Sequence, residues 1–434
     1  MDVVLRAERA LVGGRIRPAA VGVADGVIAA VGPVDADLVA RDEVYVPTSA
    51  VLLPGFVDTH VHVNAPGTDW EGFTSATAAA AAGGITTLVD MPLDSDPVTT
   101  TVGALDVKRA AARGNCSVAV DFWAGIVPTN VDDLDGLAAA GVRGFKCFLT
   151  DSGNPNFPHL SDSEFRRAAA HVARLGAVLL VHAEHHDDIA DSPRPLGRGY
   201  PSFLASRPDA AEEHAVALVL DIARGTGVRV HVVHVSSARV LPLIAAAKRE
   251  SVAVTAETCP HYLTFAAETI PDGATEYAAC PPIRGEENRR LLWDGLRQGT
   301  LDMVVSDHSP CAPEMKAGGD FGVAFGGISS LQLGPSAVWT QAQRLGFDLP
   351  DLSRWMAEHP AAMAGLTDRG RIEVGTRADL CTFDPDAERT VHAEALAHRH
   401  GITPYDGVTL RGRALQTWVE GRRVFDGERM RQPA

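Results

Sequence analysis

The sequence predicts an α/β fold: a (β/α)8 barrel of the TIM type with a small β-sandwich domain built from the N- and C-terminal segments. Three observations predict it. The 434 residues are enough for one such barrel and something smaller. In the middle of the chain, apolar β-branched runs alternate with helical patterns, which is typical of parallel βαβ units. At both ends, short alternating runs are separated by glycines, which is typical of a β-sandwich.

The barrel prediction rests on eight apolar runs that we expect to be strands. They lie at residues 51–60, 85–91, 117–125, 142–148, 177–182, 228–235, 251–257 and 301–307. Helical patterns fill the gaps between them. Ser161 and Glu164, for example, form a capping box before an amphipathic stretch, and Gly176 follows its last apolar residue. Eight such units predict a closed barrel over residues 51–369.

The remaining segments, residues 1–50 and 370–434, are expected to form one β-sandwich domain together. Glycines divide both of them into short alternating runs, such as those at 27–31 and 416–420. The barrel would then be inserted between the two halves of this domain.

Charge and composition exclude several classes of function. Lys and Arg number 39 against 55 Asp and Glu, a formal charge of −16, and no basic run interrupts this balance, so we expect neither nucleic acid nor a membrane as a partner. Charged residues near the N-terminus, among them Asp2 and Arg6, leave no room for the apolar core of a signal peptide. The six cysteines contain no CxxC pair and indicate reduced thiols in the cytoplasm. A small-molecule substrate is therefore favoured.

The sharpest motif is an HxH pair, His60 and His62, at the end of the first barrel strand. Residues two apart on a strand lie on the same face, so both imidazoles can point into the barrel mouth. Two histidines with independent roles would give the same sequence motif. The position at the carboxyl end of a barrel strand favours a pair of ligands for a divalent metal.

Lys146 lies among apolar neighbours at the end of the fourth strand. Burying an ammonium group is costly unless it is paired or neutralised. One interpretation pairs it with a carboxylate. The other leaves a neutral amine that reacts with carbon dioxide, giving a carbamate able to bridge two metal ions.

Three further polar residues end other barrel strands: His182 the fifth, His234 the sixth and Asp307 the eighth. His231, three positions before His234, faces the opposite side and is expected to pack or to support the site. Asp307 could bind a metal and also act as a general base. Four histidines, a lysine and an aspartate on one rim predict a two-metal hydrolase site, in which the metals lower the pKa of a bridging water to about 7.

This arrangement resembles the amidohydrolase superfamily, and within it the cyclic amidohydrolases, over about residues 50–385. The resemblance implies that one metal, usually zinc, is held by His60, His62 and Asp307. It implies that His182 and His234 hold the second metal, and that carboxylated Lys146 bridges the two. A metal-free relative with a structural role would be expected to lack ligands, and all six are present.

Longer strings resemble the allantoinase group more narrowly: Cys259-Pro260-His261-Tyr262 and the segments 69–73, 306–311 and 313–318. The resemblance implies that a binuclear metal-bound hydroxide opens the cyclic amide of allantoin to give allantoate, a step of purine catabolism. Asp307 would take the proton and deliver it to the leaving nitrogen. The alternative is a hydantoinase or dihydropyrimidinase acting on another hydantoin or a dihydropyrimidine. The group also suggests a homo-oligomer, either a dimer or a tetramer.

Three positions are predicted substrate contacts by the same comparison. Asn64 stands where dihydroorotases carry an arginine that binds the carboxylate of the substrate. A ring substrate with a carboxylate would therefore find no counter-ion at this position. Phe325 is the nearest match to an asparagine that dihydropyrimidinases carry in the loop after the eighth strand, so this polar substrate contact would be missing. Cys280 replaces a serine whose contact is made through the backbone. Ala65 and Asp94 depart from the expected glutamate and asparagine, which concerns substrate preference and leaves the metal ligands unchanged.

Overall fold

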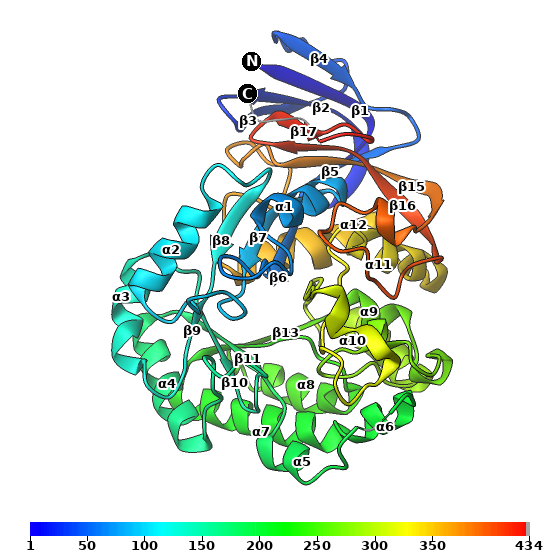
Figure 1. Ribbon diagram of the computed structural model, residues 1–434. Helices are drawn as coiled ribbons and strands as arrows, with labels where there is room; N and C mark the ends of the chain where they lie inside the picture. Colours follow the sequence, from blue (N-terminus) through cyan, green and yellow to red (C-terminus); the bar gives the residue numbers. More distant parts are fainter. Residues whose placement is uncertain (196, 431–434) are drawn as a thin grey trace.

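The computed structural model describes residues 1–195 and 197–430, and its central part is the predicted barrel (Figure 1). Neighbouring strands are parallel throughout two arcs, β6-β7-β8 and β9-β10-β11-β12-β13-β14. Only Trp123 separates β8 from β9, and a parallel bridge joins Val61, at the end of β6, to His308 in the segment that follows β14. The strands are β6 (Phe56–Val61), β7 (Ile85–Asp90), β8 (Ala119–Phe122), β9 (Ala124–Gly125), β10 (Phe145–Phe148), β11 (Val178–His182), β12 (Arg229–Val232), β13 (Val254–Thr258) and β14 (Met303–Val304).

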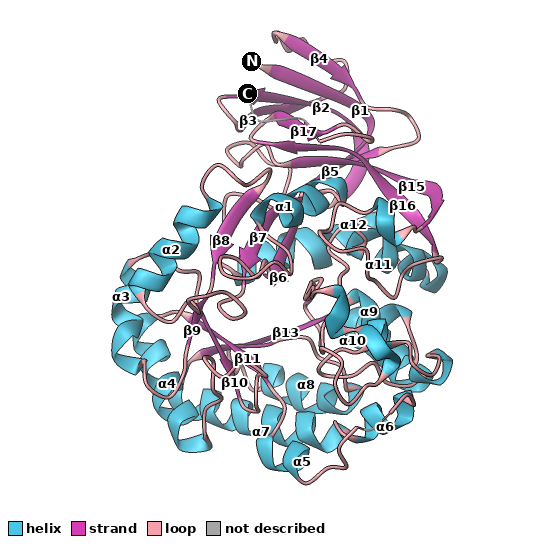
Figure 2. Cartoon of the chain, viewed as in Figure 1, coloured by secondary structure: helices cyan, strands magenta, loops and turns pink. Residues whose placement is uncertain are grey.

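Helices surround these strands, as Figure 2 shows by colour. The predicted capping box is present: Ser161 and Glu164 exchange side-chain and backbone hydrogen bonds at the start of α4, and Gly176 ends that helix in the left-handed conformation. The helices are α1 (Phe73–Ala82), α2 (Val102–Ala112), α3 (Leu134–Ala139), α4 (Asp162–Leu175), α5 (His186–Ala190), α6 (Tyr200–Ala205), α7 (Asp209–Thr226), α8 (Leu241–Arg249), α9 (Pro260–Thr264), α10 (Glu286–Arg297), α11 (Gly334–Ala342), α12 (Leu349–Ser353) and α13 (His359–Met363). A π-helical turn, Arg354–Glu358, joins α12 to α13. None of the helices in the described part of the chain has the length and apolar character needed to cross a membrane.

The two chain ends form a separate β-rich unit above the barrel in Figure 1. Its strands make one sheet in the order β17-β16-β15-β5-β1-β2-β3, with β4 also paired to β1. The sheet packs around a core that includes Leu5, Val21, Leu380 and Trp418. These strands are β1 (Val3–Val12), β2 (Arg15–Ala24), β3 (Val27–Gly32), β4 (Asp42–Tyr45), β5 (Val51–Pro54), β15 (Leu380–Thr390), β16 (Thr409–Val419) and β17 (Arg422–Phe425).

One predicted strand is divided in the structure. The apolar run at 51–60 forms β5, which pairs with β15 in the end sheet, and β6, which enters the barrel. The break falls at Gly55, where a Cβ atom would lie 2.2 Å from Oγ1 of Thr86 on β7. Only glycine fits this close approach, so the chain can pass from one sheet to the other here.

Candidate active site

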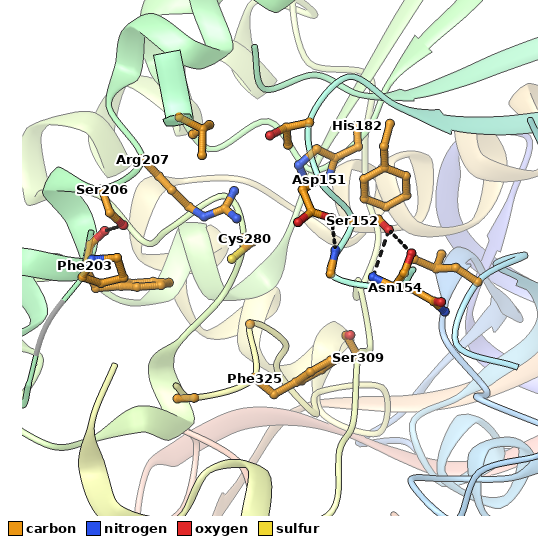
Figure 3. A pocket seen from close by; sticks show the side chains of 18 of the residues that line it. Asp151, Ser152, Asn154, His182, Phe203, Ser206, Arg207, Cys280, Ser309 and Phe325 are labelled. Carbon is orange, nitrogen blue, oxygen red and sulfur yellow. Dashed lines mark hydrogen bonds between the residues drawn. The ribbon is translucent and has the colours of Figure 1, made fainter. Parts of the chain in front are cut away.

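A cavity of about 920 Å³ lies at the carboxyl ends of the barrel strands. All six residues predicted as metal ligands line it, so the structure brings them together in one cavity. Lys146 lies within β10 and His182 ends β11, whereas His234 and Asp307 follow β12 and β14. Figure 3 shows part of this cavity, with His182, Cys280 and Phe325 on its walls.

His60, His62 and Asp307 form the most compact group. Oδ1 of Asp307 lies 3.2 Å from Nε2 of His60 and 3.5 Å from Nε2 of His62. One ligand atom from each of the three lies within 4.8 Å of the others, which is close enough to hold one metal ion. The two histidines face the same way because they are two residues apart along extended backbone.

Asp307 keeps its negative charge in this setting. Burial opposes ionisation, but the imidazoles of His60 and His62 outweigh burial and hold the pKa of its carboxyl below the usual range. Its backbone has φ +43°, in the left-handed region that a non-glycine residue seldom adopts. Such a conformation directly after a barrel strand is typical of a functional position.

His182 and His234 form a second pair, with ring centroids 4.5 Å apart. The ring of His234 also lies 5.4 Å from that of His60, which places the two groups of ligands side by side. Nδ1 of His234 is buried, and within residues 1–195 and 197–430 it has no hydrogen-bond partner. Burial, together with His182 and Lys146, lowers the pKa of His234 well below its ordinary value. A neutral imidazole with a free buried nitrogen suits a metal ligand.

Lys146 is buried, as are its chain neighbours Phe145 and Cys147, and its Nζ lies 5.0 Å from the centre of the Phe148 ring. No ion pair to this lysine occurs within the described part of the chain, so the interpretation that pairs it with a carboxylate is not what the structure shows. Burial lowers the pKa of Lys146 to about 8. The lowered pKa makes the neutral amine, which carbamate formation requires, more accessible than it is in an exposed lysine.

Sequence reasoning missed two carboxylates that support the ligands. Oε1 of Glu257 lies 2.5 Å from Nδ1 of His60, and its Oε2 lies 2.8 Å from Nε2 of His231. Burial opposes the ionisation of Glu257, but His60 and His231 lower its pKa to about 2. His231 thus supports the site through this glutamate. The available signal was an acidic residue near the end of an apolar strand.

The second missed carboxylate is Glu184, two residues after β11. Its Oε2 lies 2.8 Å from Nε2 of His182 and also accepts a hydrogen bond from Nη1 of Arg207. Glu184 is fully buried. A carboxylate that holds one nitrogen of a ligating histidine fixes the tautomer and orientation of the ring.

The predicted substrate contacts are placed differently from one another. Cys280 and Phe325 line the cavity, and the Phe325 ring packs against Trp70 with centroids 5.3 Å apart. Asn64 is 1% exposed and is not part of the cavity lining; its side-chain amide donates to the carbonyl of Pro310 at 3.0 Å. Its contribution to substrate binding stays a prediction.

The fold and this site define a class of protein. The model of the amidohydrolase family matches residues 51–424, and the chain belongs to that family. It is therefore a hydrolase of a metal-dependent family, and His60, His62 and Asp307 form a candidate metal site within it.

Individual relatives are narrower in function. The chain is 51% identical to the allantoinase of Streptomyces avermitilis, over 99% of this chain and 96% of that protein. It is 44% identical to the allantoinase of Saccharomyces cerevisiae, over 86% of this chain and 82% of the yeast protein. Among solved structures, the L-hydantoinase (dihydropyrimidinase) from Arthrobacter aurescens superposes with a TM-score of 0.93 at 29% identity, covering 99% of this chain and 97% of that one.

Proposed function

We propose that this protein hydrolyses the cyclic amide of allantoin to give allantoate. The observation that carries the proposal is the 51% identity to an allantoinase over 99% of the chain. The site supports it, because buried histidines, a lysine and an ionised aspartate surround one end of a cavity large enough for a hydantoin ring with a substituent.

We propose that two divalent metal ions, most simply zinc, bind at this site. His60, His62 and Asp307 would hold one ion, His182 and His234 the other, and Lys146, carboxylated by carbon dioxide, would lie between them. Among residues 1–195 and 197–430, Nδ1 of His234 has no hydrogen-bond partner and Lys146 has no ion-pair partner, and both observations fit this arrangement. When bound, such ions lower the pKa of water and polarise a carbonyl group.

The protein's own residues then account for positioning and proton transfer. Glu257 holds Nδ1 of His60, so Nε2 of that ring is directed at Asp307. The carboxylate of Asp307 accepts a proton from the attacking water and delivers it to the ring nitrogen as the amide C–N bond breaks. One water molecule is consumed: its oxygen and one of its protons end on the carbonyl carbon as a carboxyl group, and its other proton ends on the departing nitrogen.

A second candidate is a hydantoinase or dihydropyrimidinase activity. The superposition on the L-hydantoinase of Arthrobacter aurescens favours it as an alternative. Both activities open a cyclic amide, so they would use the same residues and differ in the substituent that the cavity accepts.

Steady-state kinetics tests this choice. The purified protein is loaded with zinc and bicarbonate, and kcat/KM is measured for allantoin, hydantoin, dihydrouracil and dihydroorotate. We expect the highest value for allantoin and no activity in the Asp307→Asn variant. Turnover of dihydrouracil without turnover of allantoin would overturn the proposal in favour of the alternative.

Three further proposals concern organisation. We propose that residues 1–50 and 370–434 form one domain, extended by β5, and that the remainder of residues 51–369 forms the other. We also propose that the protein is a dimer or tetramer of identical chains. Light scattering of the purified protein measures the oligomeric state. All six cysteines are free thiols, which supports a reducing, cytoplasmic location.

A further inference from the structure

Arg207 is a cationic side chain on the cavity wall that the proposed chemistry does not use. It lies between α6 and α7 and lines the cavity together with Cys280. Figure 3 shows its guanidinium extending toward Cys280. Among the lysines and arginines of the cavity lining, Lys146 belongs to the predicted ligands and Arg194 is exposed at the rim, whereas the Arg207 side chain is 18% exposed.

The hydrogen bonds of Arg207 leave most of its donors available. Nη1 donates to Oε2 of Glu184, and within the described residues Nε and Nη2 donate to no acceptor. A guanidinium carries five N–H groups in a rigid planar fork. The Arg207 side chain is partly exposed on the cavity wall, so these unused donors are available to a ligand that enters the cavity.

Glu184 fixes this guanidinium relative to the reacting end of the cavity. The same oxygen that accepts from Arg207 lies 2.8 Å from Nε2 of His182. Arg207 and the proposed metal ligand His182 are therefore held by one fully buried carboxylate. A ligand group that contacts the free edge of Arg207 has a defined position relative to the bond that is cleaved.

The chemistry of the proposed substrate supplies an acceptor. Allantoin is a hydantoin ring with a ureido group on its carbon 5, and hydantoin itself lacks that group. A ureido carbonyl oxygen can accept two hydrogen bonds from the side-on edge of a guanidinium. A charged donor held on the cavity wall with unused N–H groups binds better to a ligand that accepts from them than to one that leaves them to water, so Arg207 can favour allantoin over hydantoin.

We propose that Arg207 is a specificity-determining residue that donates from Nε and Nη2 to the ureido carbonyl of the substrate while Nη1 stays on Glu184. This inference rests on the proposed allantoin hydrolysis. It names the group that distinguishes allantoin from a simpler hydantoin at this site.

The test compares two ligands across matched variants. Arg207→Met removes every donor, and Arg207→Lys keeps a cation for Glu184 without the planar fork. Arg224→Met is the control, because Arg224 also pairs with a glutamate, Glu250, on the exposed surface. For each protein, kcat/KM is measured for allantoin, and hydantoin is measured both as a substrate and as a competitive inhibitor of allantoin hydrolysis.

We expect Arg207→Met to lower kcat/KM for allantoin by about 10- to 100-fold, mainly through KM, and Arg207→Lys to lower it less. The inhibition constant of hydantoin should change by less than about threefold, and Arg224→Met should match the wild type. Equal losses for both ligands would assign Arg207 a structural role and overturn the inference, as would unchanged allantoin kinetics. Should Arg207→Met fail to fold, Arg207→Lys decides by the same comparison. A wild-type protein that does not turn over allantoin would instead refute the proposed function.

Discussion

Oε1 of Glu257 lies 2.5 Å from Nδ1 of His60, although 197 positions separate the two residues in the chain. The contact joins the end of the seventh barrel strand to the end of the first. It holds His60 in one orientation, with the opposite ring nitrogen 3.2 Å from Asp307. The proposed metal site thus depends on a carboxylate that itself does not line the cavity.

Replacing this carboxylate should weaken metal binding. Glu257→Gln keeps the size of the side chain but removes its charge, so His60 loses a strong acceptor for Nδ1–H. Changes of this kind typically cost about 10- to 100-fold in metal affinity. Zinc titration with a competing chelator measures the affinity, and Glu250→Gln on the surface is the control. Wild-type zinc affinity in Glu257→Gln would contradict the supporting role of this residue.

Lys146 gives a second prediction. Because the proposed bridge is a carbamate formed on its amine, Lys146→Ala should abolish turnover and lower the bound metal below two ions per chain. A short-chain carboxylic acid, added in bicarbonate-free buffer, should partly restore turnover by supplying the missing carboxylate. Elemental analysis and initial rates measure both effects. Full activity in Lys146→Ala would refute the bridging role, and Lys248→Ala, which removes a lysine from an ion pair with Asp302, should behave like the wild type.

Part of this site could be predicted because it follows from periodicity. His60 and His62 share a face through the two-residue repeat of a strand, and His182 and Asp307 fall where the strands of a barrel end. Glu257 and Arg207 could not be assigned in this way. Their roles come from contacts between elements that are far apart in the chain, such as His60 with Glu257. Local sequence patterns do not predict such contacts.

The division of the first strand escaped prediction for a related reason. Residues 51–57 form one apolar run, and a buried strand of the end sheet has the same pattern as a buried strand of the barrel. What separates them is the approach of Thr86 to Gly55, which is a tertiary contact. A glycine within a strand indicates such a close approach but does not identify the partner.

Lys316 should make stability depend on pH in the alkaline range. Its ammonium is bonded to the carbonyls of Thr275 and Ala278, and burial lowers its pKa from 10.5 to about 8. The unfolded chain therefore binds more protons at this side chain between about pH 8 and 10.5, so its contribution to stability rises with pH in that window and is least favourable below pH 8.

Lys316→Met isolates this effect. The difference in Tm, wild type minus variant, should increase from pH 7.5 to pH 9.5, since linkage changes stability by up to about 1.4 kcal/mol per pH unit. Differential scanning calorimetry at both pH values measures it. Other titrating groups are common to the two proteins and cancel in the difference. A difference that stays constant, or that shrinks as the pH rises, would contradict the assignment.

Gly55 should tolerate no side chain, because it joins the end sheet to the barrel directly before β6. In Gly55→Ala the new methyl group would meet Oγ1 and Cγ2 of Thr86 at 2.2 and 2.3 Å, so β6 or β7 must shift. Overpacking of this kind costs about 1–3 kcal/mol of unfolding free energy. A shift of β6 would also displace His60, so we expect turnover to fall more than the loss of stability alone explains.

Gly225→Ala is the matched control: a Cβ there has no neighbour within 4 Å, and alanine in α7 should stabilise the protein by about 0.5–1 kcal/mol. Urea unfolding and kcat/KM measure the two effects, and a Gly55→Ala variant as stable and active as the wild type would show that the junction is not constrained by Thr86.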